Sequence, residues 1–122
     1  MAKTVKERFN KYYCTTKGRA RHMLNNATQR AKRNGIELSI THEWIEDKLI
    51  SGICEVTGIP FVFQENDGKG HHFNSFSPSI DRLDQSGPYS PDNCQVTCWI
   101  YNRAKGAFPI EDLRLMMDSI KR

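Results

Sequence analysis

The chain has 122 residues, 38% of them hydrophobic and 26% charged, and its formal net charge is +4. This length suits one domain with a modest core and is too short for two. No apolar run approaches the roughly 20 residues that cross a bilayer, and the opening stretch MAKTVKERFN lacks the apolar segment of a secretory signal. We therefore expect an intracellular, cytoplasmic protein, whose four cysteines are free thiols or metal ligands.

The charge is unevenly distributed. Residues 1–35 carry ten Lys or Arg and one acid, a net charge of +9, whereas residues 36–122 carry eight basic and thirteen acidic side chains, a net charge of −5. A basic segment of this kind is typical of phosphate binding. A solvated helix face and an RNA-binding module are the alternatives. We favour nucleic-acid binding through Lys17, Arg19, Arg21, Arg30, Lys32 and Arg33.

In the first half of the chain, Ala20, Leu24, Ala27 and Ala31 recur at helical spacing, which predicts a basic helix over residues 16–34. Thr41 has the character of an N-cap for a second, short helix that ends at Ser51-Gly52. Residues 53–63 are rich in β-formers around Gly58 and predict a hairpin or a bent strand. Residues 64–78 are polar and predict a loop.

In the second half, residues 79–83 and 93–97 predict two short strands, separated by the turn-rich stretch 85–92. A helix over 98–105 follows, with Thr97 as its cap and Gly106 just beyond its end. A final amphipathic helix over 110–122 offers apolar side chains to the core. These side chains are Leu113, Met116, Met117 and Ile120.

The strand-loop-strand-helix unit predicts a metal site. Asp81 lies near the end of the first strand and Asn102 lies one turn into the helix, so their oxygens can converge on a hard cation such as Mg²⁺. Asn93, at the start of the second strand, is suited to bonding backbone groups across the loop, which would fix the position of Asp81.

This segment resembles the HNH, or ββα-metal, family of nucleases, in particular the phage-type branch that reads SxDRxD, GY, DN and NRxKG. The corresponding stretches here are SIDRLD (79–84), PY (88–89), DN (92–93) and NRAKG (102–106). The resemblance implies an α+β fold with a small ββα-metal core, a basic N-terminal helix and an amphipathic C-terminal helix. It divides the chain into a basic arm and helix at 1–35 and an HNH-like domain at 36–122, with the motif at about 78–106.

The family implies roles for single residues. The first acid and the last Asn bind the catalytic metal, which carries over to Asp81 and Asn102, and the middle Asn carries over to Asn93. Where most members have a histidine base, this chain has Arg82. Arginine stays protonated and cannot accept a proton from water, so we assign Arg82 to a phosphate contact.

The general base must then come from elsewhere in the chain. His72, with its neighbour His71, is the first candidate, because imidazole titrates near working pH and their loop leads into the Asp81 strand. Tyr89 is a second, as a phenol whose pKa the metal and Arg82 would lower. Asp84 is a third, with capping of the turn as its alternative role.

Zinc-binding members of the family carry two CxxC pairs, and this chain keeps only the first cysteine of each. The corresponding stretches read CEVT (54–57) and CWIY (98–101). Two thiolates seldom hold structural zinc, so we expect none, with Trp99 and Tyr101 filling that space.

The sequence thus predicts a metal-dependent endonuclease that hydrolyses phosphodiester bonds in DNA, with Mg²⁺ as cofactor and Mn²⁺ as its substitute. Duplex DNA is the expected partner, and Arg103 and Lys105 would contact its backbone. A catalytically inactive DNA-binding or inhibitory protein of the same fold is the alternative. One HNH site acts on one strand, so a homodimer remains an option for double-strand cleavage.

Overall fold

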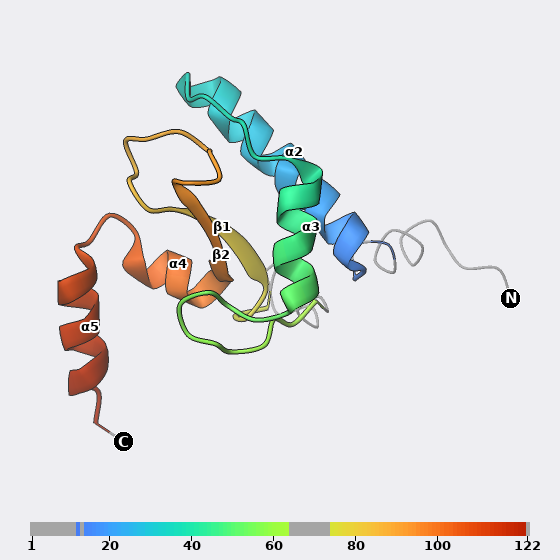
Figure 1. Ribbon diagram of the computed structural model, residues 1–122. Coiled ribbons are helices and arrows are strands. Elements are labelled where there is room, and N and C mark those ends of the chain that lie inside the picture. Colours follow the sequence, from blue (N-terminus) through green and yellow to red (C-terminus); the bar gives the residue numbers. More distant parts are fainter. Residues whose placement is uncertain (1–11, 13, 64–73, 122) are drawn as a thin grey trace, which may run out of the picture.

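The computed structural model describes residues 12, 14–63 and 74–121. Within these residues the chain forms four helices and a two-stranded antiparallel sheet, so the α+β class is confirmed (Figure 1). The elements in chain order are α2 (Thr16–Asn34), α3 (His42–Ser51), β1 (Pro78–Arg82), β2 (Cys94–Cys98), α4 (Trp99–Lys105) and α5 (Ile110–Ser119).

Helix α2 is bounded at both ends by capping residues in the sequence. The Thr15 hydroxyl accepts a hydrogen bond from the Gly18 N–H, and Gly35 ends the helix in the left-handed conformation with φ 64°. Of the predicted stripe, Ala20, Ala27 and Ala31 are buried, whereas Leu24 is only partly buried and Met23 takes a core position beside it. The small side chains allow α3 and β1 to pack closely against α2.

The second helix, α3, also has the predicted cap, because the Thr41 side chain accepts from the Trp44 N–H. It buries Ile45 and Leu49 in the core, while Trp44 packs against the core from a half-buried position. The hairpin or bent strand expected at residues 53–63 does not form as a strand, although the turn at Gly58 is present, at φ 74°. These residues hold one isolated bridge between Ile53 and Pro60.

The sheet pairs β1 with β2 in a register that places Ile80 opposite Val96 and Asp81 opposite Gln95. The two predicted strands are confirmed with one-residue shifts at their ends. The predicted Thr97 cap is wrong, since α4 begins at Trp99 and its N-cap residue, Cys98, makes no side-chain capping bond. Instead, the Trp99 N–H donates to the Ser77 carbonyl, which ties the helix start to the residue before β1.

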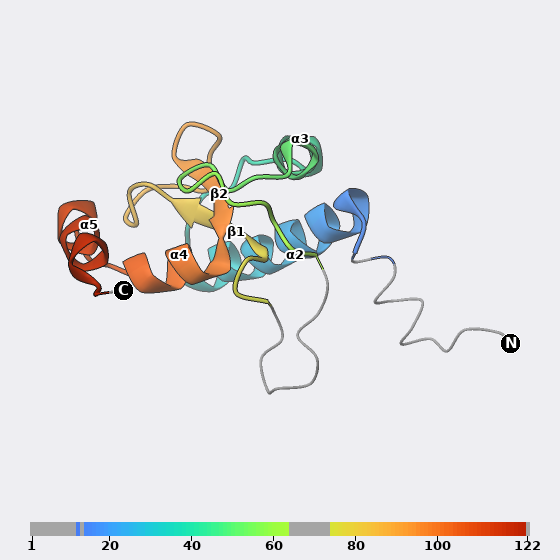
Figure 2. The same cartoon turned by 90° about the horizontal axis from the view of Figure 1, so that it is seen from below.

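Helices α2, α3 and α4 all contact the sheet, and the buried core lies among them. Figures 1 and 2 both show α5 at the edge of the molecule, beyond α4 and far from α2 and α3. No helix among the described residues is both long and apolar enough to cross a membrane.

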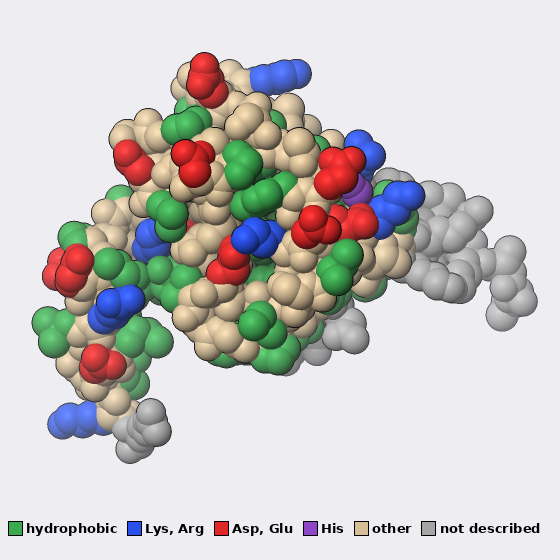
Figure 3. Space-filling view, in the orientation of Figure 1, with side chains coloured by type: hydrophobic (Ala, Val, Ile, Leu, Met, Phe, Trp, Pro, Cys, Tyr) green, Lys and Arg blue, Asp and Glu red, His purple; other side chains and the backbone are tan. Residues whose placement is uncertain are grey.

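The prediction that α5 supplies four core side chains is wrong. Only Leu113 is buried, whereas Met116, Met117 and Ile120 are 51%, 56% and 59% exposed. Figure 3 shows hydrophobic side chains gathered over this helix, at the edge of the molecule. The helix also ends at Ser119, earlier than expected, and its packing against the other helices and strands is mainly with α4.

Candidate functional site

A cavity of about 360 Å³ opens beside the end of β1. Its walls come from α2, β1, the loop that follows β1, and α4. The side chains that can bind anions or cations there are Arg30, Asp81, Arg82, Asn102 and Arg103. Of the residues predicted to form the site, Asp81, Arg82, Tyr89 and Asn102 therefore line one cavity, although they are up to 21 positions apart in the sequence.

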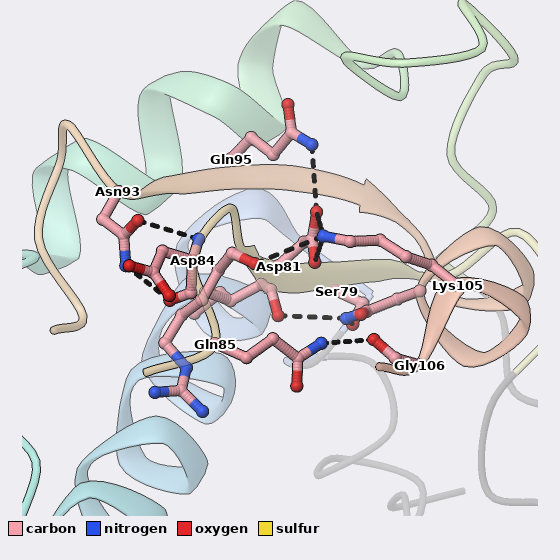
Figure 4. Close-up of polar contacts among 11 residues, drawn as sticks. Ser79, Asp81, Asp84, Gln85, Asn93, Gln95, Lys105 and Gly106 are labelled. Carbon is pink, nitrogen blue, oxygen red and sulfur yellow. Dashed lines mark hydrogen bonds and ion pairs between the residues drawn. The ribbon is translucent and has the colours of Figure 1, made fainter. Parts of the chain in front are cut away.

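Asp81 is almost completely buried, at 1% exposure, and its carboxylate is fully engaged. The Lys105 ammonium donates to Oδ1 at 2.7 Å and to Oδ2 at 2.9 Å, and Gln95 donates to Oδ2 at 2.9 Å (Figure 4). The same ammonium also donates to the Arg82 carbonyl at 3.2 Å. Lys105 thus reaches back from the last turn of α4 and neutralises the carboxylate from within the protein.

Asn102 is held in place by its amide nitrogen. Nδ2 donates to the Ser79 hydroxyl at 2.7 Å and to the Ile80 carbonyl at 3.0 Å, both on β1. Within the described residues no donor is bonded to Oδ1. The two bonds fix the rotation of the amide group, so its oxygen is available to a ligand in the cavity.

This donor set can be tested against a metal ion. No cluster of three or more His, Cys, Asp or Glu side chains suited to a metal occurs within residues 12, 14–63 and 74–121. One carboxylate and one amide oxygen do fit Mg²⁺, which keeps several waters and takes phosphate oxygens as further ligands. The fit has one condition. An ion would have to reach a carboxylate that is 1% exposed and whose two oxygens already accept from the Lys105 ammonium.

Arg82 points its guanidinium at the loop after β1. It donates to the Gly87 carbonyl at 2.9 Å and lies 4.7 Å from the centre of the Tyr89 ring. Arg30 of α2 donates through Nε to the Tyr89 hydroxyl at 3.4 Å. The Tyr89 side chain is therefore enclosed between two guanidinium groups, both on the cavity wall. This arrangement presents two fixed positive charges to an anion.

Asn93 braces the loop between the strands. Its Oδ1 accepts from the Asp84 N–H, and its Nδ2 donates to the carbonyls of Asp84 and Pro88, at 2.8 to 3.0 Å. These are the bonds across the loop that the sequence predicts. Gly87 lies so close that a Cβ there would sit 2.8 Å from Nδ2 of Asn93, so the brace requires glycine at this position.

Asp84 caps the turn. Its Oδ1 accepts from both the N–H and the hydroxyl of Ser86, and these bonds lower the pKa of the carboxyl group. A lower pKa makes Asp84 a weaker base, and the residue is not among those that line the cavity. Of the two roles considered for Asp84, the structure favours capping.

The predicted phosphate-binding residues fall into three groups. Lys17, Arg21, Arg30, Lys32 and Arg33 are exposed along α2, and Arg103 is exposed on α4 with its guanidinium 5.7 Å from the Trp99 ring centre. Arg19 is buried and donates to the Phe63 carbonyl. Lys105 is buried against Asp81. A direct phosphate contact thus remains predicted for the exposed residues, while Arg19 and Lys105 lie inside the protein.

The two remaining cysteines of the CxxC pattern lie together. Cys54 and Cys98 are both buried, and their thiols interact. Burial and the neighbouring Cys54 raise the pKa of Cys98, whereas for Cys54 hydrogen bonds from Thr57 and the backbone outweigh burial and lower the pKa. Thr57 occupies the position of the second cysteine in a CxxC pair, and its side chain hydrogen-bonds to both thiols. Tyr101 and Trp99 are half-buried beside them. The absence of zinc remains a prediction.

The first candidate bases, His71 and His72, lie outside the described residues. His22 of α2 lies near the site and was not predicted from the sequence. It lines a second cavity, of about 120 Å³, which shares Arg30, Ser79, Ile80 and Trp99 with the larger one. A single histidine on a basic helix resembles a solvated surface residue, and only the packing of α2 against β1 reveals its position.

Comparison with protein-family models, with curated proteins and with solved structures finds no match to this chain.

Proposed function

We propose that this protein is a metal-dependent endonuclease of the HNH type that hydrolyses phosphodiester bonds in DNA. The observation that carries the proposal is the single cavity in which Asp81 and Asn102 meet Arg30, Arg82 and Arg103. Oxygen ligands for a hard cation and guanidinium groups for a phosphate are what such hydrolysis requires in one place. The antiparallel β1–β2 pair followed by α4 is also the order of elements that the resemblance implies.

In this proposal Asp81 and Asn102 would hold Mg²⁺, or Mn²⁺ in its place, and such an ion would supply stabilisation of negative charge on the phosphate and on the leaving 3′ oxygen. Arg82 and Arg30, fixed around Tyr89, bind the non-bridging oxygens of the scissile phosphate. Asn93 keeps the loop, and with it Arg82, in place. The exposed cations of α2 contact flanking phosphates of the duplex.

A second function is favoured by one specific observation, the Lys105–Asp81 ion pair. A carboxylate that already has a buried ammonium partner does not need a metal. If the pair persists in the presence of divalent ions, the protein would bind DNA through its arginines without cutting it. This alternative is a DNA-binding or inhibitory protein on the same scaffold, and its binding would weaken steeply with salt.

A plasmid-nicking assay across Mg²⁺, Mn²⁺ and Ca²⁺, with DNA affinity measured in parallel, separates the two. The endonuclease requires nicking that EDTA abolishes and that Asp81→Ala and Asn102→Ala each reduce by about 100-fold or more, because the ion would lose a ligand. Lys48→Ala, distant from the cavity, serves as the matched control. Tight DNA binding with no nicking under any metal would select the alternative.

A further inference from the structure

The proposed reaction lacks an assigned base, since Arg82 cannot accept a proton. We propose that His22 of α2 is the general base of this site, an inference that rests on the proposed endonuclease function. Within the described part of the chain, His22 is the one histidine that lines either cavity. The remaining described histidine, His42, lies at the start of α3, where its Nε2 contacts the Lys17 carbonyl.

Position supports the assignment first. The two cavities share Arg30 from α2, Ser79 and Ile80 from β1, and Trp99 from α4. The two cavities therefore adjoin, and His22 lines one while Arg82 lines the other. Asp81 lies on β1 and Asn102 bonds Ser79 of the same strand, which is a wall residue of both cavities. Arg30 lines both cavities as well, so a water molecule beside His22 can lie next to a phosphate bound at Arg30.

The protonation state of the ring also suits a base. The Asn26 amide nitrogen can only donate, so Nε2 of His22, 3.3 Å away, is the accepting nitrogen and the neutral ring carries its proton on Nδ1. This hydrogen bond is long, and a water molecule can replace it. Burial, together with the Arg19 charge, lowers the pKa of His22, so the ring is neutral at neutral pH.

The charged groups around His22 define how it would respond to substrate. Within the described residues, Arg19 and Arg30 line its cavity from α2, and Pro78, Ser79, Ile80 and Trp99, which do not titrate, line it from β1 and α4. Burial and the Arg19 charge disfavour a positive charge on the imidazole. A bound phosphate brings compensating negative charge, which makes the ring a stronger base when substrate is present.

In the proposed hydrolysis, a water O–H bond breaks and its proton moves to Nε2 of His22. The water oxygen uses the freed electron pair to form a bond to phosphorus. The P–O3′ bond breaks, and the 3′ oxygen leaves with that pair and takes a proton from solvent. The products are a 5′-phosphate and a 3′-hydroxyl, and the imidazolium returns its proton to bulk water.

The test compares His22→Gln and His22→Ala with the parent and uses His42→Gln as the matched histidine control. His71→Gln and His72→Gln test the competing candidates for the base in the same assay. Single-turnover nicking with Mn²⁺ is measured from pH 5 to 8.5, and duplex affinity is measured with Ca²⁺. We expect His22→Gln to lose about 100-fold or more in rate while binding DNA about as tightly as the parent. We also expect exogenous imidazole to restore part of the activity of His22→Ala.

Two readouts exclude a merely structural role. The parent rate should rise through a pKa below 6.5, and this limb should vanish in His22→Gln. In a Ca²⁺ complex with a duplex oligonucleotide, the ring signals of His22 should shift in NMR spectra while those of His42 stay unchanged. A His22→Gln rate within about threefold of the parent, or a loss that imidazole does not rescue, overturns the inference while the endonuclease function stands. A parent that nicks DNA with no metal overturns both.

Discussion

Replacement of Lys105 by methionine tests the buried ion pair at the centre of the site. Methionine keeps the apolar stem of lysine and removes the ammonium. Among the described residues, the Asp81 carboxylate, at 1% exposure, would then keep Gln95 as its side-chain hydrogen-bond donor. Breaking a buried pair by removing one partner costs about 3–5 kcal/mol. For a domain of this size that corresponds to a fall in Tm of roughly 10–20 °C.

Thermal and chemical denaturation in EDTA would measure this change, and Lys48→Met is the matched control. Lys48 pairs with Glu55 at 2.6 Å, but both side chains are about one-third exposed, and such a pair is worth about 0–1 kcal/mol. The double variant Lys105→Met with Asp81→Asn removes both charges. It should recover most of the stability that the single variant loses, since no unpaired charge remains.

The outcomes discriminate clearly. If Lys105→Met costs no more than Lys48→Met, then the ammonium does not neutralise a buried carboxylate, and the geometry of the site is different from that described above. If the double variant is as unstable as the single one, the loss does not come from an unpaired Asp81 charge.

Three further predictions concern other parts of the molecule. Gly87→Ala should destabilise the protein by about 1–3 kcal/mol and lower nicking, because the new Cβ would displace the Asn93 amide; urea denaturation would measure the first effect. The lowered pKa of His22 means that the unfolded chain binds a proton more readily, so stability should fall as pH drops from 6.5 through that lowered pKa, and His22→Gln should remove this component of the Tm profile. Iodoacetamide at pH 7.5 should modify exposed Cys14 at least about tenfold faster than Cys94, whose pKa burial raises to about 11, as peptide mass spectrometry would report; equal rates would contradict this.

The features that the sequence predicted well depend on neighbouring residues. The Thr41 cap and the Gly35 end of α2 each arise within one helical turn, and the structure confirms both. The strands around residues 80 and 96 follow from short-range alternation and a turn-rich loop between them. The Asn93 bonds were also foreseeable, because an Asn at that point of a tight loop has few partners other than loop backbone.

The features that were missed depend on distant contacts. From the sequence, Lys105 is predicted to bind DNA, because no neighbouring residue indicates that it pairs with Asp81, 24 positions earlier. The apolar side chains of α5 show which face of the helix would be buried. They do not show whether other parts of the protein lie against that face, and Leu113 is the one of the four predicted side chains that is buried. His22 lines a cavity because α2 packs on β1, and no local sequence pattern predicts that packing.

The Asp81 carboxylate already has a cation beside it, the Lys105 ammonium, which donates to both of its oxygens. If the proposed metal ion binds Asp81, it would lie close to this ammonium and compete with it for the carboxylate. Such competition would weaken metal binding. We therefore expect Lys105→Met, although less stable in EDTA, to bind Mn²⁺ at least about tenfold more tightly than the parent, which is about 1.4 kcal/mol. Calorimetric titration well below the Tm of the variant would measure both affinities, with Asp81→Asn as the control that should not bind. Equal affinities in parent and variant would mean that Lys105 does not compete with the ion for Asp81, and binding by Asp81→Asn would mean that the carboxylate is not a ligand.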